Sequence, residues 1–159
     1  MRCYGLSERE VLNSPERLST WARTRSPWLF HINACSCNGC DIEIVAALTP
    51  KYDAERFGAV LVPSPRHADV LVVTGVVNPQ TKDRLLRVYQ QMPEPKFVLA
   101  VGACACGGGV FKGCYNAGQG VDNIVPVDMF VPGCPPKPEG ILYGIVQLLN
   151  KVRSNDKPK

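Results

Sequence analysis

Four cysteines lie where they could bind a metal centre. Cys37 and Cys40 form a close pair with two residues between them, whereas Cys104 and Cys134 stand alone farther along the chain. They lie in stretches rich in glycine or proline, at residues 36–40, 102–104 and 132–136. Cysteine thiolates bind iron–sulfur clusters, usually with four ligands, and they also bind zinc. The pattern therefore predicts one metal centre built from three separate loops.

An iron–sulfur cluster fits this spacing better than zinc does. Structural zinc sites usually close on two near pairs of ligands, such as one C-x-x-C with another. Here the third and fourth candidate ligands have 29 residues between them. A C-x-x-C after a strand also occurs in thioredoxin-like redox proteins, but that interpretation leaves Cys104 and Cys134 without a role. We therefore predict a cubane cluster, with an all-cysteine zinc site as the alternative.

Four further cysteines remain: Cys3, Cys35, Cys106 and Cys114. Cys35 and Cys106 each lie two residues from a proposed ligand, so either could take that ligand's place. The C-x-x-C spacing is the commoner one at clusters, and it favours Cys37 together with Cys40. We expect the remaining cysteines to behave as small buried hydrophobic residues.

Two carboxyl groups follow the cysteine pair. Glu43 lies three residues after Cys40, which is about one helical turn, so it is expected to face the same site. A carboxyl group there could carry protons. The alternative is that Glu43 binds the free N–H groups of a helix start. Asp41 is the better candidate for an interaction with the helix dipole alone.

The elements that must position these residues alternate between strands and helices. The predicted strands are residues 28–32, 59–62, 69–75, 96–101 and 125–131, and the predicted helices are 15–24, 41–48, 80–91 and a last one from Pro138. Such alternation predicts an α/β fold with a mainly parallel sheet and helices on both faces. Residues 102–109 are expected to form a loop, and Asn78 is expected to cap the helix that follows it.

Parallel strands place their carboxyl ends along one edge of the sheet, where such folds bind ligands. Cys37 and Cys40 follow the first predicted strand, and Cys104 and Cys134 follow the last two. All four are therefore expected at the same edge. Arg66 and His67 precede a strand, so they are expected at the opposite edge, in a surface contact.

Composition bounds the possible function classes. The chain has 159 residues, of which 45% are hydrophobic and 20% charged, as in ordinary globular proteins. Its net charge of +4 forms no basic stripe, which argues against nucleic-acid binding, and no apolar run reaches a membrane span of about 20 residues. No secretory signal is evident, so we expect a reducing compartment. The expected division is an arm at 1–26, one domain at 27–153 and a polar tail at 154–159.

The chain shows no recognisable substrate machinery. The glycines at 107–109 do not form a G-x-G-x-x-G motif, no Walker motif is present, and the two histidines have no evident nucleophile beside them. A cluster without such machinery predicts an electron-transfer subunit whose active site belongs to another chain.

Five motifs together resemble one protein family. They are Cys37–Glu43 (CNGCDIE), Pro63–Asp69 (PSPRHAD), Gly102–Ala105 (GACA) with Gly108–Gly109, Ile124–Asp128 (IVPVD) and Val131–Pro136 (VPGCPP). They resemble the small subunit of membrane-bound, energy-converting (group 4) nickel–iron hydrogenases of the Ech and formate-hydrogenlyase type. The resemblance extends from about Ser26 to Val152. The 20 kDa cluster subunit of respiratory complex I (NADH:quinone oxidoreductase) is a close relative of that family.

The resemblance implies a flavodoxin-like domain that holds one proximal 4Fe–4S cluster. The family's ligands fall on Cys37, Cys40, Cys104 and Cys134, and its glutamate falls on Glu43. It also implies partners: a large subunit with the nickel–iron centre, a ferredoxin-like polyferredoxin subunit and membrane subunits that translocate ions. The chain would then be a peripheral subunit on the cytoplasmic face of the cell membrane, held there by its partners.

The number of residues between the first two cysteines distinguishes the hydrogenase subunits from the complex I subunits. Complex I chains have adjacent cysteines, as Cys-Cys-x-x-Glu, whereas this chain has the hydrogenase form, Cys-x-x-Cys-x-x-Glu. We therefore expect an electron-transfer subunit of an energy-converting hydrogenase. The alternatives are the cluster subunit of a related complex I-like quinone or sulfur-compound oxidoreductase and, from another class, a zinc-stabilised α/β interaction module.

Overall fold

The core of the molecule is a five-stranded sheet. The computed structural model describes residues 22–118 and 120–155. The strands are β1 (Trp28–Asn33), β2 (Val60–Leu61), β3 (Val70–Thr74), β4 (Phe97–Val101) and β5 (Met129–Val131). Their order is β2-β1-β3-β4-β5, and every neighbouring pair is parallel. This is the flavodoxin-like order, so the predicted α/β class is confirmed, and the sheet is entirely parallel.

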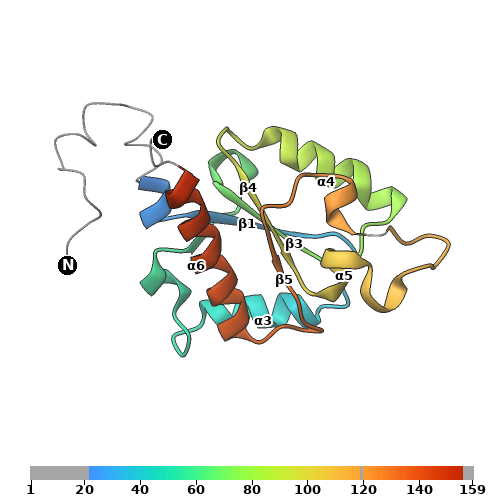
Figure 1. Ribbon diagram of the computed structural model, residues 1–159, viewed down its shortest axis with the longest axis horizontal. Coiled ribbons are helices and arrows are strands. Elements are labelled where there is room, and N and C mark those ends of the chain that lie inside the picture. Colours follow the sequence, from blue (N-terminus) through green and yellow to red (C-terminus); the bar gives the residue numbers. More distant parts are fainter. Residues whose placement is uncertain (1–21, 119, 156–159) are drawn as a thin grey trace.

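Helices cover both faces of the sheet (Figure 1). The helices are α3 (Gly39–Leu48), α4 (Pro79–Gln91), α5 (Ala103–Gly107) and α6 (Pro138–Asn155). Side chains of α3 and α6 share one apolar core with the sheet, and side chains of α4 and α5 share the other. The two cores together hold the central strands, which carry the site.

The central strand alternates between these two cores. Val70 and Val72 of β3 pack in the core with α3 and α6, whereas Leu71 and Val73 pack in the core with α4 and α5. Successive residues of a strand point to opposite faces, so a strand buried on both faces must be apolar throughout. Full burial of one such side chain stabilises the fold by about 1.5–3 kcal/mol.

The start of α4 agrees with the prediction at Asn78. The Asn78 side chain accepts a hydrogen bond from the Thr81 backbone N–H at 2.7 Å, and the Thr81 hydroxyl oxygen accepts one from the Asn78 N–H at 3.1 Å. This reciprocal cap satisfies two of the otherwise free N–H groups of the helix start. Pro79 is the first helical residue, one position earlier than expected.

Two predicted elements differ from the structure. The last strand begins at Met129 rather than at residue 125, because Pro126 has no N–H to donate and Val125 packs beneath α5 instead. The Asp128 carboxylate then accepts a hydrogen bond from the Val98 N–H at 2.8 Å, just before the strand starts. The expected loop at 102–109 contains the helix α5. The helix predicted at 15–24 lies mostly outside the described residues.

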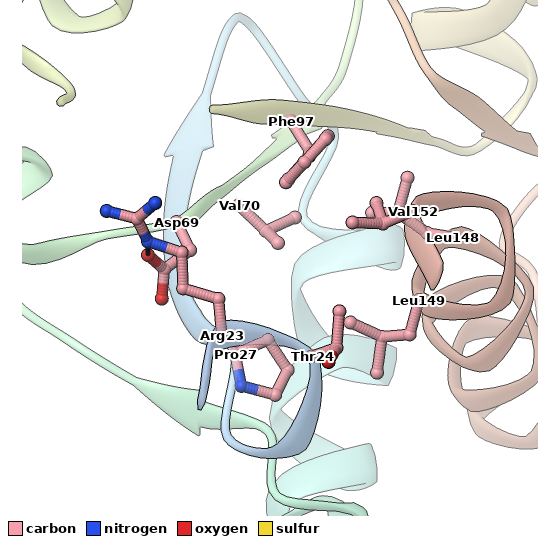
Figure 2. A pocket seen from close by; sticks show the side chains of 9 residues that line it. All are labelled: Arg23, Thr24, Pro27, Asp69, Val70, Phe97, Leu148, Leu149 and Val152. Carbon is pink, nitrogen blue, oxygen red and sulfur yellow. Dashed lines mark ion pairs between the residues drawn. The ribbon is translucent and has the colours of Figure 1, made fainter. Parts of the chain in front are cut away.

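A small hollow lies at the amino ends of β3 and β4 (Figure 2). Its lining is apolar apart from Thr24 and an ion pair between Arg23 and Asp69, whose Nε and Oδ1 atoms are 2.9 Å apart. Phe97 and Leu148 close it from the sheet and from α6. This hollow is at the edge of the sheet opposite the cysteines, so we assign it no chemistry.

Over residues 22–118 and 120–155, no helix combines the length and apolar character needed to cross a membrane.

Candidate metal centre

The four candidate ligands lie at the carboxyl edge of the sheet. Cys40 is in the first turn of α3 and buried, and Cys37 precedes that helix and is exposed. Cys104 is half-buried in α5, which follows β4, and Cys134 is exposed in the loop after β5. Three segments that are remote in sequence thus meet at one edge, as the parallel sheet predicts.

Backbone hydrogen bonds join the two segments that carry the single cysteines. The Gly102 N–H donates to the Val131 carbonyl at 2.8 Å, and the Ala103 N–H donates to the Gly133 carbonyl at 2.7 Å. These bonds continue the pairing of β4 with β5 past the ends of both strands. Cys104 directly follows Ala103, and Cys134 directly follows Gly133. The hydrogen bond between Ala103 and Gly133 therefore sets the separation of the two cysteines.

Electrostatics indicates that the four thiols lie near one another. Burial raises the pKa of the Cys40 thiol to about 11, and the negative charges of Cys104, Cys37, Asp41 and Cys134 add to the rise. Burial likewise raises the pKa of Cys104, with contributions from Cys134 and Cys37, against a lowering hydrogen bond from the Val110 backbone. Holding these four sulfurs together as thiolates would require a positive charge among them, which iron would supply.

Glycines leave room beside these sulfurs. A Cβ atom on Gly102, where φ is 92°, would lie only 2.5 Å from the Cys40 Sγ. A Cβ on Gly109 would lie 3.1 Å from the Cys104 Sγ, and one on Gly39 would lie 3.6 Å from the Cys37 Sγ. Bare backbone therefore packs against three of the four sulfurs. The donor set and its surroundings fit an iron–sulfur cluster.

A single zinc ion would need its ligands closer together than an iron–sulfur cluster does. Within the two described stretches of chain, no three Cys, His, Asp or Glu side chains are placed to hold one metal ion. Tetrahedral zinc with Zn–S bonds of about 2.3 Å needs sulfurs within about 4 Å of one another. A cubane cluster separates its ligands more widely, because each thiolate binds a different iron atom.

The remaining cysteines behave in different ways. The Cys106 Sγ is half-buried, 3.8 Å from the carbonyl oxygens of Ala100 and Val131, and packs against the core beneath α4 and α5. Cys35 is exposed, and its sulfur lies 3.8 Å from the Asn78 side-chain nitrogen. Cys114 is also exposed. The expectation of buried hydrophobic residues is therefore wrong for Cys35 and Cys114, and Cys3 lies outside the described residues.

Asp41 does more than interact with the helix dipole, because it also binds side chains of the sheet. Its carboxylate accepts hydrogen bonds from the Thr74 hydroxyl at 2.5 Å and from the Asn33 amide at 2.7 Å, and its Oδ1 lies 3.0 Å from the His31 Nε2. These partners come from β1 and β3. The only indication of these contacts in the sequence was weak: a few polar residues lie at or near the ends of two strands that are mostly apolar.

Glu43 is half-buried on α3, one turn after Cys40. The alternative that it caps the helix is not supported, because α3 begins at Gly39 and Asp41 is the acid in its first turn. In the described part of the chain, no side chain or backbone group hydrogen-bonds to its carboxylate. Its role in proton transfer stays a prediction.

Arg66 and His67 form the short 3₁₀ turn η2 (Pro65–His67), which precedes β3. The His67 ring packs edge-on against the Trp28 ring, with 6.4 Å between the ring centroids. Trp28 is the first residue of β1, so this pair is at the amino edge of the sheet, as expected.

Residues 37–148 match the family described as NADH ubiquinone oxidoreductase, 20 Kd subunit. The chain belongs to this family. Members of this family typically bind an iron–sulfur cluster through cysteines. The matched range begins at Cys37 and contains all four candidate ligands of this 20 kDa-family chain.

Three relatives of this 20 kDa-family chain are informative. The "Probable membrane-bound hydrogenase subunit mbhJ" of Pyrococcus furiosus is 61% identical over 128 residues, covering 80% of this chain and 77% of the relative. Formate hydrogenlyase subunit 7 of Escherichia coli is 48% identical over 125 residues, covering 79% of this chain and 49% of the relative. A chain in the structure of an archaeal membrane-bound sulfane sulfur reductase is 39% identical, with a TM-score of 0.77 and coverage of 87% and 77%.

Proposed function

We propose that this chain is the cluster-bearing, electron-transfer subunit of a membrane-bound hydrogenase complex. The observation that carries the proposal is the 61% identity to a membrane-bound hydrogenase subunit over 80% of the chain. The 48% identity to a formate hydrogenlyase subunit supports it. The interval of two residues between Cys37 and Cys40 supports the same class.

Cys37, Cys40, Cys104 and Cys134 would hold one 4Fe–4S cluster, which supplies one-electron transfer when bound. The chain's own residues supply the rest of the site. Bare backbone at Gly102 and Gly109 lies against the sulfurs, and Cys40 is buried at the start of α3. Cys37 and Cys134 are exposed, so the site reaches the surface where another chain can exchange electrons with it. Glu43 is the candidate proton relay beside it.

The proposed partners follow from the same relationship. A large subunit would carry the nickel–iron centre, and a ferredoxin-like polyferredoxin subunit would exchange electrons with this chain. Membrane subunits would couple the electron transfer to ion translocation. The chain would sit peripherally at the cytoplasmic face of the membrane through these partners.

A second candidate function is the corresponding subunit of a complex that reduces a sulfur compound or a quinone. The observation that favours it is the TM-score of 0.77 and 39% identity to a chain of a sulfane sulfur reductase complex. The sequence of the large subunit would distinguish the two candidate functions, because binding of nickel there requires two C-x-x-C pairs.

The test is metal analysis of the purified native complex that contains the full chain. Hydrogenase function predicts nickel, iron, acid-labile sulfide and hydrogen oxidation coupled to a ferredoxin. Iron and sulfide without nickel or hydrogen oxidation would favour the second candidate. Zinc in this chain without iron or sulfide would contradict both candidates and favour the zinc-stabilised interaction module.

A further inference from the structure

The Asp41 carboxylate joins the ends of two strands to the helix that carries Cys40. The Thr74 hydroxyl donates to Oδ1, and the Asn33 amide donates to Oδ2. The His31 Nε2 lies 3.0 Å from Oδ1 and 2.9 Å from the Thr74 hydroxyl oxygen. Asn33 and Thr74 are paired residues in the register of β1 with β3. Both carboxylate oxygens are thus bound by groups on the sheet.

These contacts extend into the loop that carries Cys37. The Asn33 Oδ1 accepts hydrogen bonds from the backbone N–H groups of Cys35 and Ser36, at 3.0 and 2.8 Å. The same Asn33 side chain donates to Asp41, so one amide connects the loop with the carboxylate. Asn33 thus connects the segment that precedes Cys37 with the carboxylate that follows Cys40.

Hydrogen-bonding groups on the sheet hold this carboxylate in one place. A hydroxyl, an amide and an imidazole nitrogen surround it. Thr74 is fully buried, and Asp41 is half-buried, so solvent screens this charge only in part. Asp41 thus places a fixed negative charge next to a candidate ligand.

A fixed negative charge beside a cluster opposes the arrival of an electron. Reduction of an iron–sulfur cluster adds one negative charge to it, and net charge and hydrogen bonds around the sulfurs set its potential. The carboxylate is one residue from Cys40 and is held in one place by its donors, so the interaction is stronger than for a freely moving surface charge.

We propose that Asp41 is a positioning residue that fixes the Cys37–Cys40 segment and lowers the reduction potential of the cluster bound there. The proposal rests on the proposed function, because it requires that the four cysteines hold a cluster. It assigns to this carboxylate a task separate from proton transfer at Glu43. A low potential suits a centre that exchanges electrons with hydrogen chemistry.

The test is a redox titration of the purified complex, followed by electron paramagnetic resonance, on the wild type, Asp41→Asn and Asp41→Ser. The signal of this cluster is identified as the one that Cys104→Ser removes. The matched control is Asp83→Asn, which removes the same charge from the exposed surface of α4. We expect a positive shift of the midpoint potential in both Asp41 variants and none in the control, with iron content retained.

The outcomes separate this inference from the proposed function. No cluster signal in the wild type would contradict the proposed function itself. A wild-type signal whose potential is unchanged in Asp41→Asn and Asp41→Ser, or shifts equally in Asp83→Asn, would overturn only the assignment to Asp41. Loss of the cluster from both Asp41 variants would show that the residue is needed for cluster assembly. That result would also overturn the proposal that Asp41 sets the reduction potential. Asp41→Glu keeps the charge, so it should restore part of the lower potential.

Discussion

The side chains of Cys104 and Cys106 take opposite sides of the short helix α5. Cys106 directs its sulfur toward the carbonyl oxygens of Ala100 and Val131, at 3.8 Å, in the core of the molecule. Cys104 lies beside Gly109 and acts electrostatically on Cys40. Residues two apart in a helix do not share a face, so only one of the two can reach the other candidate ligands.

This relationship predicts different effects of two matched substitutions. Cys104→Ser should abolish the cluster, because it removes one of four thiolates, whereas Cys106→Ser should retain it. The measurement is iron and acid-labile sulfide per chain, together with the visible absorption of the cluster. Cys35→Ser is a further control, since its sulfur lies against Asn78. Cluster loss in Cys106→Ser with retention in Cys104→Ser would show that the ligand was assigned to the wrong cysteine.

Gly102 is expected to tolerate no side chain. Gly102→Ala would place a Cβ 2.5 Å from the Cys40 sulfur and would strain a backbone whose φ is 92°. We expect loss of most of the cluster, in addition to a backbone cost of about 1–3 kcal/mol. The measurements are iron content and thermal unfolding of the full chain.

Gly113 supplies the matched control for Gly102. Its φ is 88°, but no atom lies within 4 Å of the position that its Cβ would take. Gly113→Ala should therefore show the backbone cost alone and keep the cluster. Equal iron content in the two variants would contradict a steric role for Gly102 at the metal centre.

Thr74 is expected to contribute to stability through its hydroxyl. Thr74→Val keeps the shape of the buried side chain but removes the donor to Asp41, which leaves a carboxylate oxygen with one partner fewer. The cost should be about 1–3 kcal/mol. Chemical denaturation of the full chain measures it. Thr74→Ser keeps the hydroxyl and should lose less; a larger loss for serine than for valine would point to packing rather than to hydrogen bonding.

Glu43 is expected to affect turnover and not assembly. Glu43→Gln should lower hydrogen turnover of the complex by about 10-fold or more, because a positioned acid–base group typically contributes 10²–10⁴-fold. The cluster content should stay unchanged, since no described group hydrogen-bonds to this carboxylate. Glu55→Gln, on an exposed 3₁₀ turn, is the control for charge. Wild-type turnover in Glu43→Gln would remove Glu43 from the candidate proton path.

Much of the fold and of the metal centre could be predicted from local patterns. Apolar runs identified the strands β3 and β4 to within a residue, because a strand buried on both faces must be apolar throughout, and the partly buried β1 was identified equally closely. The alternation with helices implied a parallel sheet, and a parallel sheet collects its carboxyl ends at one edge. That rule alone placed Cys37, Cys40, Cys104 and Cys134 at the same edge.

The errors in prediction came from segments where the local pattern misleads. Residues 125–128 are apolar enough for a strand, but Pro126 cannot donate to the ladder, and the strand starts only at Met129. The glycines around Ala103–Gly107 indicated a loop, yet these residues form α5, whose first residue, Ala103, donates its N–H to the Gly133 carbonyl in the segment after β5.

The sequence by itself determined the order of strands and helices along the chain and the position of each cysteine relative to a strand end, since both depend on neighbouring residues. The tertiary structure decided which side of α5 each cysteine takes and which groups surround Asp41. His31, Asn33 and Thr74 reach that carboxylate only because β1 pairs with β3 in a register that sets Asn33 opposite Thr74. Register and helix orientation follow from packing across the whole core, and no local stretch of sequence encodes them.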